Sequence, residues 1–520
     1  MRVRSARGRL HLVAGVGGGA LIGLSLPPIG WWPMAVAGVA AVAWALAGRS
    51  SRSRLAVGML AGIGQFSISL VWALQFNTAG YAVLAIVEAC FVAVACVLVP
   101  PGRGRLPAIT GALVLAEFAR ESWPFGGLPL GGLALGQLDG PFGLTARVGG
   151  PLLVVGVTVL AGASLAALLP PAATTGGVSG AADADAGPLH RSLRALLGIA
   201  VVVALTAVAA VAPNGGGSAA RTGSADEIRV AIVQGGGRRG LDQLQVPASV
   251  VFAAAVQATE KVPSGVQLIL WPEDVVGLNG PFLGSSAEAT LAEIARSHHA
   301  TLVAGVTYPV GTTLFRNEIV AFSPAGALVA TFEKVHRVPF GEYVPDRGFF
   351  KHLANLKDIP RDAIAGHGSG MISTPVGRAA VLVSYEVFFA NRGRSGVRAG
   401  GRIIFVPTNT SSYSNGQAPA QEIAASQLQA LEEGRYVLQA APTGYSAIID
   451  SDGDVQTHTP LSSRAVIVAT VPLLSGTTWY ERYGDEPILL AALALVAGGW
   501  MLSLSRPARR RRRPRKSPSS

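Results

Sequence analysis

Residues 81–99 read YAVLAIVEACFVAVACVLV, the clearest apolar run in a chain of 520 residues. A helix needs about 20 mostly apolar residues to cross the hydrocarbon core of a bilayer, and this run is long enough. Glu88 lies in the middle of the run. A carboxylate at that depth is either part of a functional site or a protonated group bonded to a neighbouring helix. The stretch therefore predicts a membrane protein.

Further apolar runs lie on both sides of this one. Six more precede Pro213, near 10–26, 32–48, 56–75, 106–119, 149–169 and 195–212, and another follows near 487–504. The run near 106–119 is short and contains Glu117, so we expect it to extend into the interface or to pack inside the bundle. Together the runs predict an α-helical bundle of about eight spans, with seven in residues 1–212 and the eighth at 487–505.

The charge distribution agrees with a membrane protein. Only 14% of the residues are charged, against roughly 25% in a typical soluble domain. Residues 213–486 hold 21 basic and 24 acidic residues, whereas the rest of the chain holds 21 basic and 6 acidic residues. The basic excess thus lies beside the apolar runs, which indicates membrane topology and not a nucleic-acid partner. Cys90 and Cys96, both in the quoted run, are the only cysteines, which excludes a disulfide framework.

The positive-inside rule orients the chain. With the N-terminus inside, the inside segments carry 19 basic residues, and the short outside loops carry only Arg120 and Arg147. This predicts a multipass plasma-membrane protein with both termini in the cytoplasm and residues 213–486 outside. We interpret the first run as an uncleaved anchor. The basic tail at 506–520 is expected to contact anionic membrane lipids and not nucleic acid.

The outside segment alternates strand and helix patterns. Small-residue linkers at 170–193 and 213–226 precede it. Strands are expected at 228–234, 267–271, 301–307, 379–385, 403–406 and 465–471, helices at 250–260, 286–296 and 418–433, and hairpin turns at 322–326 and 452–453. This alternation predicts an α/β domain over 213–486.

Polar residues follow three of the expected strands. They are Glu273 in Trp271-Pro272-Glu273, Lys334 and Glu342 in the segment 333–345, and Ser384 in Val383-Ser384-Tyr385-Glu386. In α/β folds the ligand crevice lies beyond the carboxyl ends of strands. A carboxylate, an ammonium and a hydroxyl in that place suit a base, an oxyanion stabiliser and a nucleophile. From the residues alone, a solvated Glu and Lys and a packed Ser are the alternative.

At these residues the sequence resembles the apolipoprotein N-acyltransferase family, the membrane branch of the nitrilase superfamily. The motifs are WPE at 271–273, K-x-x-x-VPFGE-x-VP at 334–345, YEVFF at 385–389 and LEEGRYVLQAAPTGYSAIID at 431–450. The resemblance covers nearly the whole chain, because the family likewise has eight spans and one extracytoplasmic domain. It implies a four-layer αββα nitrilase-type fold for that domain.

The resemblance also implies a Glu–Lys–Cys triad. Carried over, Glu273 is the general base and Lys334 its electrostatic partner. Glu342 is a second carboxylate near the site, Tyr385 supplies a backbone N–H to the oxyanion, and Glu386 lies beside them. No metal and no soluble cofactor is implied.

Two features depart from the family pattern. Ser384 stands where the family has cysteine, and the outside domain contains no cysteine at all. A thiol has a pKa of about 8.5, whereas a serine hydroxyl needs strong base assistance. The site has therefore either adapted to an acyl-serine route, as Ser–Lys hydrolases do, or lost its covalent chemistry. In addition, residues 408–413 read TNTSSY where the family often has a tryptophan-bearing Asn-Asp segment, and Gln421-Glu422 follow where it has a Gln-His pair. Small polar residues thus largely replace the bulky ones expected at the acyl-chain entrance.

These observations predict an acyltransferase. The acyl donor would be a phospholipid and the acceptor the N-terminal cysteine amine of a diacylated apolipoprotein. A nitrilase-type amide hydrolase and a catalytically silent membrane scaffold are the alternatives. A polyprenol-phosphate mannosyltransferase is a further candidate partner by family analogy alone.

Overall fold

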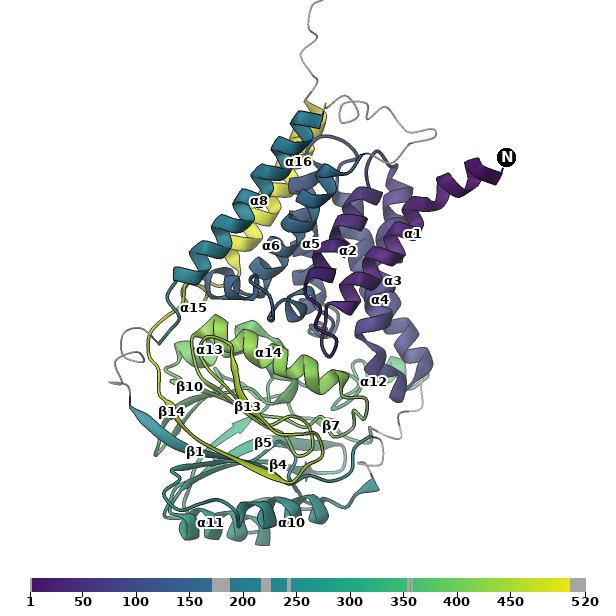
Figure 1. Ribbon diagram of the computed structural model, residues 1–520. Coiled ribbons are helices and arrows are strands. Elements are labelled where there is room, and N and C mark those ends of the chain that lie inside the picture. Colours follow the sequence, from purple (N-terminus) through teal and green to yellow (C-terminus); the bar gives the residue numbers. More distant parts are fainter. Residues whose placement is uncertain are drawn as a thin grey trace, which may run out of the picture.

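The chain forms a helical bundle stacked on an α/β domain (Figure 1). The computed structural model describes residues 2–170, 188–216, 226–240, 245–352, 356 and 359–505. The basic tail expected at 506–520 lies outside these residues, as do 171–187 and 217–225 of the two expected linkers.

Every expected apolar run forms a helix. Within the described residues, the helices of the bundle are α1 (Arg2–Leu24), α2 (Pro33–Ala45), α3 (Ser51–Ser69), α4 (Thr78–Leu98), α5 (Arg105–Ser122), α6 (Ala146–Leu168), α8 (Pro188–Val211) and α16 (Glu486–Leu504). The short 3-10 helices η1 (Val71–Gln75), η2 (Leu133–Gly136) and η3 (Gly143–Thr145) lie in its connections.

Four segments of the described chain are long and apolar enough to cross a membrane by themselves. They are Thr78–Leu98, Gly143–Leu168, Leu189–Val211 and Glu486–Leu504. The other bundle helices are too short or too polar to meet this criterion, so it does not account for all of the eight expected spans. α2 has 13 residues, and α5 carries Glu117 and Arg120, which are buried inside the bundle. The expectation that the run near 106–119 packs inside is therefore confirmed.

Small residues let the bundle helices approach closely. A Cβ atom added at Gly62 of α3 would lie 2.5 Å from the Ala89 Cα atom of α4. A Cβ atom added at Gly19 of α1 would lie 1.8 Å from the Ala61 carbonyl oxygen of α3. Helix contacts of this kind are typical of membrane bundles, where packing and not the hydrophobic effect holds the helices together.

The α/β domain contains two sheets. The eight-stranded sheet has the order β14-β1-β2-β4-β5-β6, with β3 on β4 and β7 on β5, and the six-stranded sheet has the order β13-β12-β11-β10-β9-β8. The strands of the first sheet are β1 (Glu227–Gln234), β2 (Leu268–Leu270), β3 (Val276–Gly277), β4 (Thr301–Val310), β5 (Leu314–Phe322), β6 (Leu328–Glu333), β7 (Asp362–Ala363) and β14 (Ala465–Pro472). Those of the second are β8 (Met371–Thr374), β9 (Gly377–Val381), β10 (Ile403–Pro407), β11 (Val437–Ala440), β12 (Ala447–Ile449) and β13 (Val455–His458).

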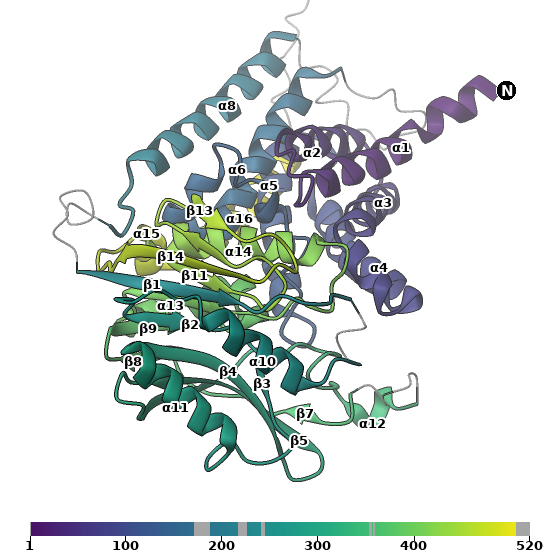
Figure 2. The same ribbon diagram turned by 60° about the horizontal axis from the view of Figure 1, so that its bottom comes forward.

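Helices cover the outer face of each sheet (Figures 1 and 2). The pair α10 (Ala248–Thr259) and α11 (Ser286–His298) packs on the eight-stranded sheet, and α13 (Ala390–Arg398) and α14 (Gln417–Glu433) pack on the six-stranded sheet. Between the sheets lies an apolar core that includes Val230, Leu268, Val381 and Phe405. This is the four-layer αββα arrangement that the resemblance implies.

The α13–α14 layer faces the membrane bundle (Figure 1). Gln421 on α14 donates to the Ser69 carbonyl oxygen at 2.8 Å, and the Trp72 backbone N–H donates to Gln417 at 2.9 Å. Two further short helices, α12 (Arg347–Phe350) and α15 (Trp479–Tyr483), lie in the connections. The six-stranded sheet is thus held close to the ends of the bundle helices.

Most expected elements of the domain are present, with one consequential error. The hairpin turns at 322–326 and 452–453 are confirmed, because β5 pairs antiparallel with β6 and β12 with β13. The strand expected at 379–385 ends at Val381 instead, and Ser384–Phe388 form a 3-10 helix, η5. The extended run stops because Ser384 adopts a left-handed backbone conformation, with φ of +49°.

Candidate active site

Each candidate site residue follows a strand, two of them in the eight-stranded sheet and one in the six-stranded sheet. Glu273 follows β2, Lys334 follows β6, and Ser384 follows β9. A glycine on β4 makes room for the turn that carries Glu273, since a Cβ atom at Gly305 would lie 2.6 Å from the Glu273 Cα atom. Gly305 also donates its N–H to the Pro272 carbonyl oxygen at 3.0 Å. The sheet therefore fixes the backbone that presents this carboxylate.

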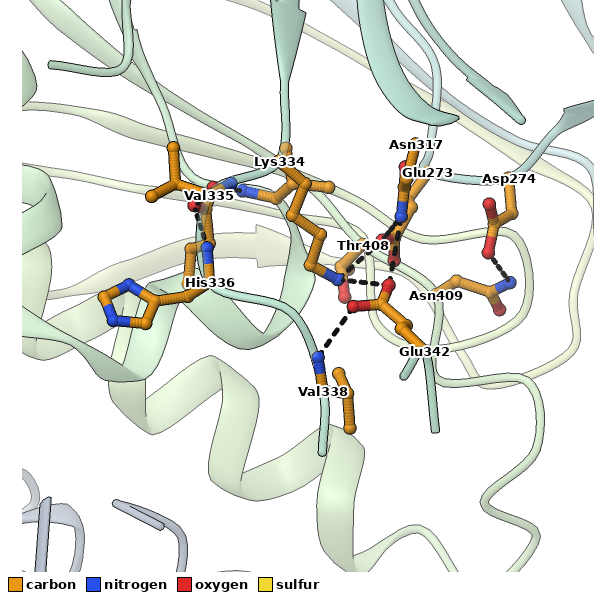
Figure 3. A network of polar contacts seen from close by, with 12 residues as sticks. Glu273, Asp274, Asn317, Lys334, Val335, His336, Val338, Glu342, Thr408 and Asn409 are labelled. Carbon is orange, nitrogen blue, oxygen red and sulfur yellow. Dashed lines mark hydrogen bonds and ion pairs between the residues drawn. The ribbon is translucent and has the colours of Figure 1, made fainter. Parts of the chain in front are cut away.

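Lys334 lies between two carboxylates in a buried network (Figure 3). Its Nζ atom is 2.9 Å from Glu273 Oε1 and 2.8 Å from Glu342 Oε1. The Asn317 amide on β5 donates to the same two oxygens, at 2.8 Å and 3.0 Å. The second oxygen of Glu342 accepts from the Val338 N–H at 2.7 Å. The structure thus brings together three of the residues proposed from sequence.

The network sets the charges of its members. Burial raises the pKa of Glu273, although Lys334 and the Asn317 hydrogen bond oppose this. Burial also disfavours the ammonium of Lys334, but Glu273 and Glu342 overcome it and raise its pKa above the ordinary value. The two carboxylates thus favour the protonated, positively charged form of Lys334. Among the described residues none donates a hydrogen bond to Glu273 Oε2, so this oxygen is available to accept a proton.

Two further buried carboxyl groups border the network. Asp274 accepts from the Asn409 amide at 3.5 Å, and burial together with the Glu273 charge raises its pKa to about 7. Glu422 on α14 accepts a short hydrogen bond from the Thr408 hydroxyl, and burial raises its pKa to about 8. Sequence reasoning did not assign a role to either group. The Gln421-Glu422 pair on an otherwise buried helix was the available signal for Glu422.

Ser384 stands in a strained turn that follows β9. It is half-buried, its φ of +49° is rare for a residue with a side chain, and it opens η5. Strain of this kind is typical of functional positions. Among the described residues no hydrogen bond joins the Ser384 hydroxyl to Glu273 or Lys334. The triad proposed from sequence is therefore not hydrogen-bonded together in this state.

Glu386 connects the two segments that carry Lys334 and Ser384. Its Oε1 atom accepts from the Val335 N–H at 2.9 Å and the His336 N–H at 3.0 Å, and its Oε2 atom accepts from the Val383 N–H at 2.9 Å. Val335 follows Lys334 directly, and Val383 directly precedes Ser384. Glu386 is thus a brace between the two segments and not a member of the ion-pair network.

Tyr385 and His336 border the turn. The Tyr385 hydroxyl donates to the Gly127 carbonyl oxygen of the bundle at 2.7 Å. His336 stacks on Phe389 with ring centroids 4.2 Å apart, and burial lowers its pKa to about 4. His336 points away from the Lys334 ammonium (Figure 3), so it packs beside the site as a neutral ring.

Asn317 is the network residue that sequence reasoning missed. It is 1% exposed in the middle of β5, where an amide needs partners. Its sequence context, LFRNEIVAF, is that of an ordinary strand, so only its contacts reveal its role. Within the described residues no group of three or more His, Cys, Asp and Glu side chains is placed to hold a metal ion.

Comparison with known proteins agrees with the two-part architecture. The N-terminal domain of apolipoprotein N-acyltransferases matches residues 18–164, and the carbon-nitrogen hydrolase family matches residues 229–481. The apolipoprotein N-acyltransferase of Mycolicibacterium smegmatis is 30% identical over 93% of this chain and 83% of its own length. The chain belongs to the apolipoprotein N-acyltransferase family. The apolipoprotein N-acyltransferase of Azotobacter vinelandii is 28% identical over 94% of both chains.

Solved structures similar to this member of the apolipoprotein N-acyltransferase family cover about half of the chain. An amidase from Nesterenkonia has 20% identity over 48% of this chain and 91% of its own, with a TM-score of 0.34. A carbon-nitrogen hydrolase from Helicobacter pylori has 15% identity over 50% of this chain and 91% of its own, with a TM-score of 0.34. The carbon-nitrogen hydrolase match and the observed sheet order together give the α/β domain its nitrilase-type fold.

Proposed function

We propose that the chain transfers an acyl group from a membrane phospholipid to the N-terminal cysteine amine of a diacylated lipoprotein, with Ser384 as the nucleophile. The carrying observation is the buried network of Lys334 with Glu273 and Glu342 at the strand ends. Glu386 ties this network to the strained turn of Ser384. The family supplies the class of donor and acceptor.

In the first half-reaction the Ser384 hydroxyl attacks the carbonyl carbon of a phospholipid ester. Glu273 takes the hydroxyl proton on Oε2, directly or through one water. Lys334 and the Tyr385 N–H stabilise the negative charge that develops on the carbonyl oxygen. The bond from the carbonyl carbon to the glycerol oxygen breaks, the leaving oxygen takes the proton from Glu273, and a lysophospholipid departs. The acyl group remains on Ser384 as an oxygen ester.

In the second half-reaction the lipoprotein amine attacks the acyl-serine ester. Glu273 accepts a proton from the amine, the bond to the Ser384 oxygen breaks, and the serine oxygen regains that proton. An amide forms and the enzyme returns to its first state. Lys334 carries the same electrostatic role in both steps, because its pKa is raised by its two carboxylate partners.

Serine makes this chemistry slower than cysteine would. Each tenfold of rate corresponds to about 1.4 kcal/mol of barrier. A site that keeps the charge layout of a thiol enzyme is expected to activate a hydroxyl less well. We therefore expect low turnover with Ser384 and equal or higher turnover with Ser384→Cys.

We also propose that the chain has eight spans, with both termini inside and the domain outside. The contact between two turns supports this topology. The N–H of Gly48, in the turn after α2, donates to the carbonyl oxygen of Pro101, in the turn after α4. These two basic turns thus lie together, and the α/β domain packs on the other end of the bundle (Figure 1). The polyprenol-phosphate mannosyltransferase stays a family analogy, since none of the comparisons bears on it.

A silent scaffold is the second candidate, favoured by the serine itself. Ser384 lacks the thiol on which the family chemistry depends, and its hydroxyl has no hydrogen-bonded base among the described residues. A scaffold would bind lipoproteins or membrane partners through the same surfaces. It would tolerate loss of the hydroxyl.

Complementation separates these candidates. The chain is expressed in a bacterial strain depleted of its own apolipoprotein N-acyltransferase, and lipoprotein triacylation is measured by mass spectrometry. We expect triacylation with the wild type and with Glu293→Gln, an exposed glutamate of α11, and none with Glu273→Gln. Triacylation at wild-type level with Glu273→Gln would contradict the proposal. Release of free fatty acid without triacylation would favour the hydrolase alternative.

A further inference from the structure

The membrane bundle holds a buried charged cluster that the proposed mechanism does not use. Arg120 of α5 is 1% exposed. Its Nε atom lies 2.7 Å from Glu88 Oε2 on α4, and its Nη1 atom lies 3.1 Å from Glu117 Oε1 on α5. Charged side chains inside a bundle are costly and are retained chiefly for function. The cluster must therefore be explained beyond helix packing.

The charged cluster joins α4 to α5 and also forms hydrogen bonds to the loop that follows α5. The remaining Arg120 nitrogen, Nη2, donates to the Leu130 carbonyl oxygen at 2.5 Å, and the Leu128 N–H donates to the Arg120 carbonyl oxygen at 2.9 Å. Glu117 Oε1 accepts from the Leu133 N–H at 3.2 Å. A Cβ atom at Gly132 would lie 2.6 Å from Glu117 Oε1. The loop 127–133 is thus fixed against the charged cluster.

The opposite side of the same loop contacts the candidate active site. The Gly127 carbonyl oxygen accepts from the Tyr385 hydroxyl at 2.7 Å, and the Gly131 N–H donates to Gln421 Oε1 at 3.0 Å. Leu130 packs with Tyr385 in one apolar cluster. Tyr385 directly follows Ser384, and its backbone N–H is the proposed oxyanion donor. A continuous set of hydrogen bonds therefore joins Glu88 to the residue beside the nucleophile.

We propose that Glu88, Arg120 and Glu117 are positioning residues for acyl transfer: through the loop 127–133 they fix the Tyr385 main chain against the oxyanion. The inference rests on the proposed function and extends it into the membrane. A planar guanidinium can satisfy Glu88, Glu117 and Leu130 together, which an ammonium cannot do with the same geometry. The positioning role therefore requires the planar guanidinium of Arg120, and a positive charge without that geometry is not sufficient for it.

The test uses the full-length protein in vesicles with labelled phospholipid and a diacylated lipopeptide. Tyr385→Phe removes only the hydroxyl that bonds to the loop. Arg120→Lys keeps the positive charge but loses the planar set of N–H donors. The matched control is Tyr81→Phe, which removes a hydroxyl bonded to the Ser67 carbonyl oxygen at 2.6 Å inside the bundle. We expect kcat to fall about fivefold in Tyr385→Phe, as for one lost buried hydrogen bond, with KM for phospholipid and kcat of the control unchanged.

A double variant distinguishes positioning from general damage. If both residues act through the same loop, combining Arg120→Lys with Tyr385→Phe lowers kcat by less than the product of the two single effects. Multiplicative effects, or a fall in kcat for Tyr81→Phe equal to that for Tyr385→Phe, would overturn the inference. If the wild type transfers no acyl group while the single variants melt at its temperature, the proposed function itself fails. If the wild type is active and Tyr385→Phe matches it, only this inference fails.

Discussion

Asn317 is the residue on which both carboxylates of the site depend. Its amide donates to Glu273 and to Glu342, and its hydrogen bond lowers the pKa of Glu273 against the effect of burial. Without the Asn317 amide, Lys334 would be the only one of these two donors left to bridge the Glu273 and Glu342 carboxylates. The amide thus helps to keep Glu273 deprotonated and able to act as a base.

Asn317→Ala is expected to move the pH profile of acyl transfer. Loss of the amide raises the pKa of Glu273 further, and a general base works only when deprotonated. The acidic limb of the profile of kcat/KM against pH should therefore shift to higher pH. The profile is measured with labelled phospholipid and a diacylated lipopeptide. An unshifted limb would contradict the assignment of Glu273 as the base.

The raised pKa values of Asp274 and Glu422 predict how the free energy of unfolding of the protein depends on pH. Burial raises the pKa of Asp274 to about 7 and that of Glu422 to about 8 in the folded protein. Between about pH 4 and these values the folded state keeps protons that the unfolded state has lost, so stability falls as pH rises. The slope is at most about 1.4 kcal/mol per pH unit for each group.

Asp274→Asn is therefore expected to flatten this dependence. The melting temperature in detergent is measured from about pH 4 to about pH 8. Asp454→Asn provides the control, because it makes the same chemical change at an exposed position. An Asp274→Asn slope as steep as that of the wild type would show that Asp274 does not keep its proton.

At the scale of elements, β4 can approach the Glu273 turn because residue 305 is a glycine and has no side chain. A Cβ atom at Gly305 would lie 2.6 Å from Glu273 Cα, 2.7 Å from the Pro272 carbonyl oxygen and 2.9 Å from the Asp274 nitrogen. All three are backbone atoms, so no side-chain rotation relieves the contact. The position of the base is thus coupled to the sheet.

Gly305→Ala is expected to displace the turn and to reduce acyl transfer at least tenfold, since small misplacements of reacting groups cost about 10²-fold in rate. Gly280→Ala is the matched control, because nothing lies within 4 Å of its added methyl group. Triacylation in the depleted strain and the melting temperature are measured together. Full activity of Gly305→Ala would show that the turn adjusts freely.

The elements also show how far the sequence alone could predict the site. Buried strands such as β2 and β10 are predictable because uninterrupted apolar runs allow little else. The motifs and their positions in the sequence also predict that Glu273 and Lys334 lie at strand ends. The turn at Ser384 was not predicted, because VLVSY is as apolar as a strand and its end depends on Glu386 accepting from Val383, Val335 and His336. Such contacts between distant segments leave no local pattern.

At the scale of the whole molecule, the bundle and the domain meet at the site. α14 lies between the six-stranded sheet and the bundle (Figure 1), and Tyr385 reaches Gly127 across the junction. The apolar runs predicted where the bundle helices lie, but not that α5 would bury Arg120 with Glu88 and Glu117. Pairing between helices, and not hydropathy along one helix, makes that burial possible.

The proposed topology predicts which side of the membrane each turn faces. A variant without Cys90 and Cys96 is free of thiols, and single cysteines are then placed at Ser50 in the turn after α2 and at Ser285 before α11. A maleimide that cannot cross the membrane is added to intact cells. We expect it to label Ser285→Cys and to reach Ser50→Cys only after the cells are opened. Labelling of Ser50→Cys in intact cells would reverse the orientation.

The most direct test of the central claim measures acyl-enzyme formation on Ser384. Purified wild type, Ser384→Ala and Ser384→Cys are incubated with phospholipid carrying a labelled acyl chain, and protein-bound label is followed with and without neutral hydroxylamine. We predict a slowly formed, hydroxylamine-resistant label on the wild type, none on Ser384→Ala, and an equal or larger, hydroxylamine-sensitive label on Ser384→Cys. Wild type that restores lipoprotein triacylation in cells but carries no label at Ser384 would contradict the claim.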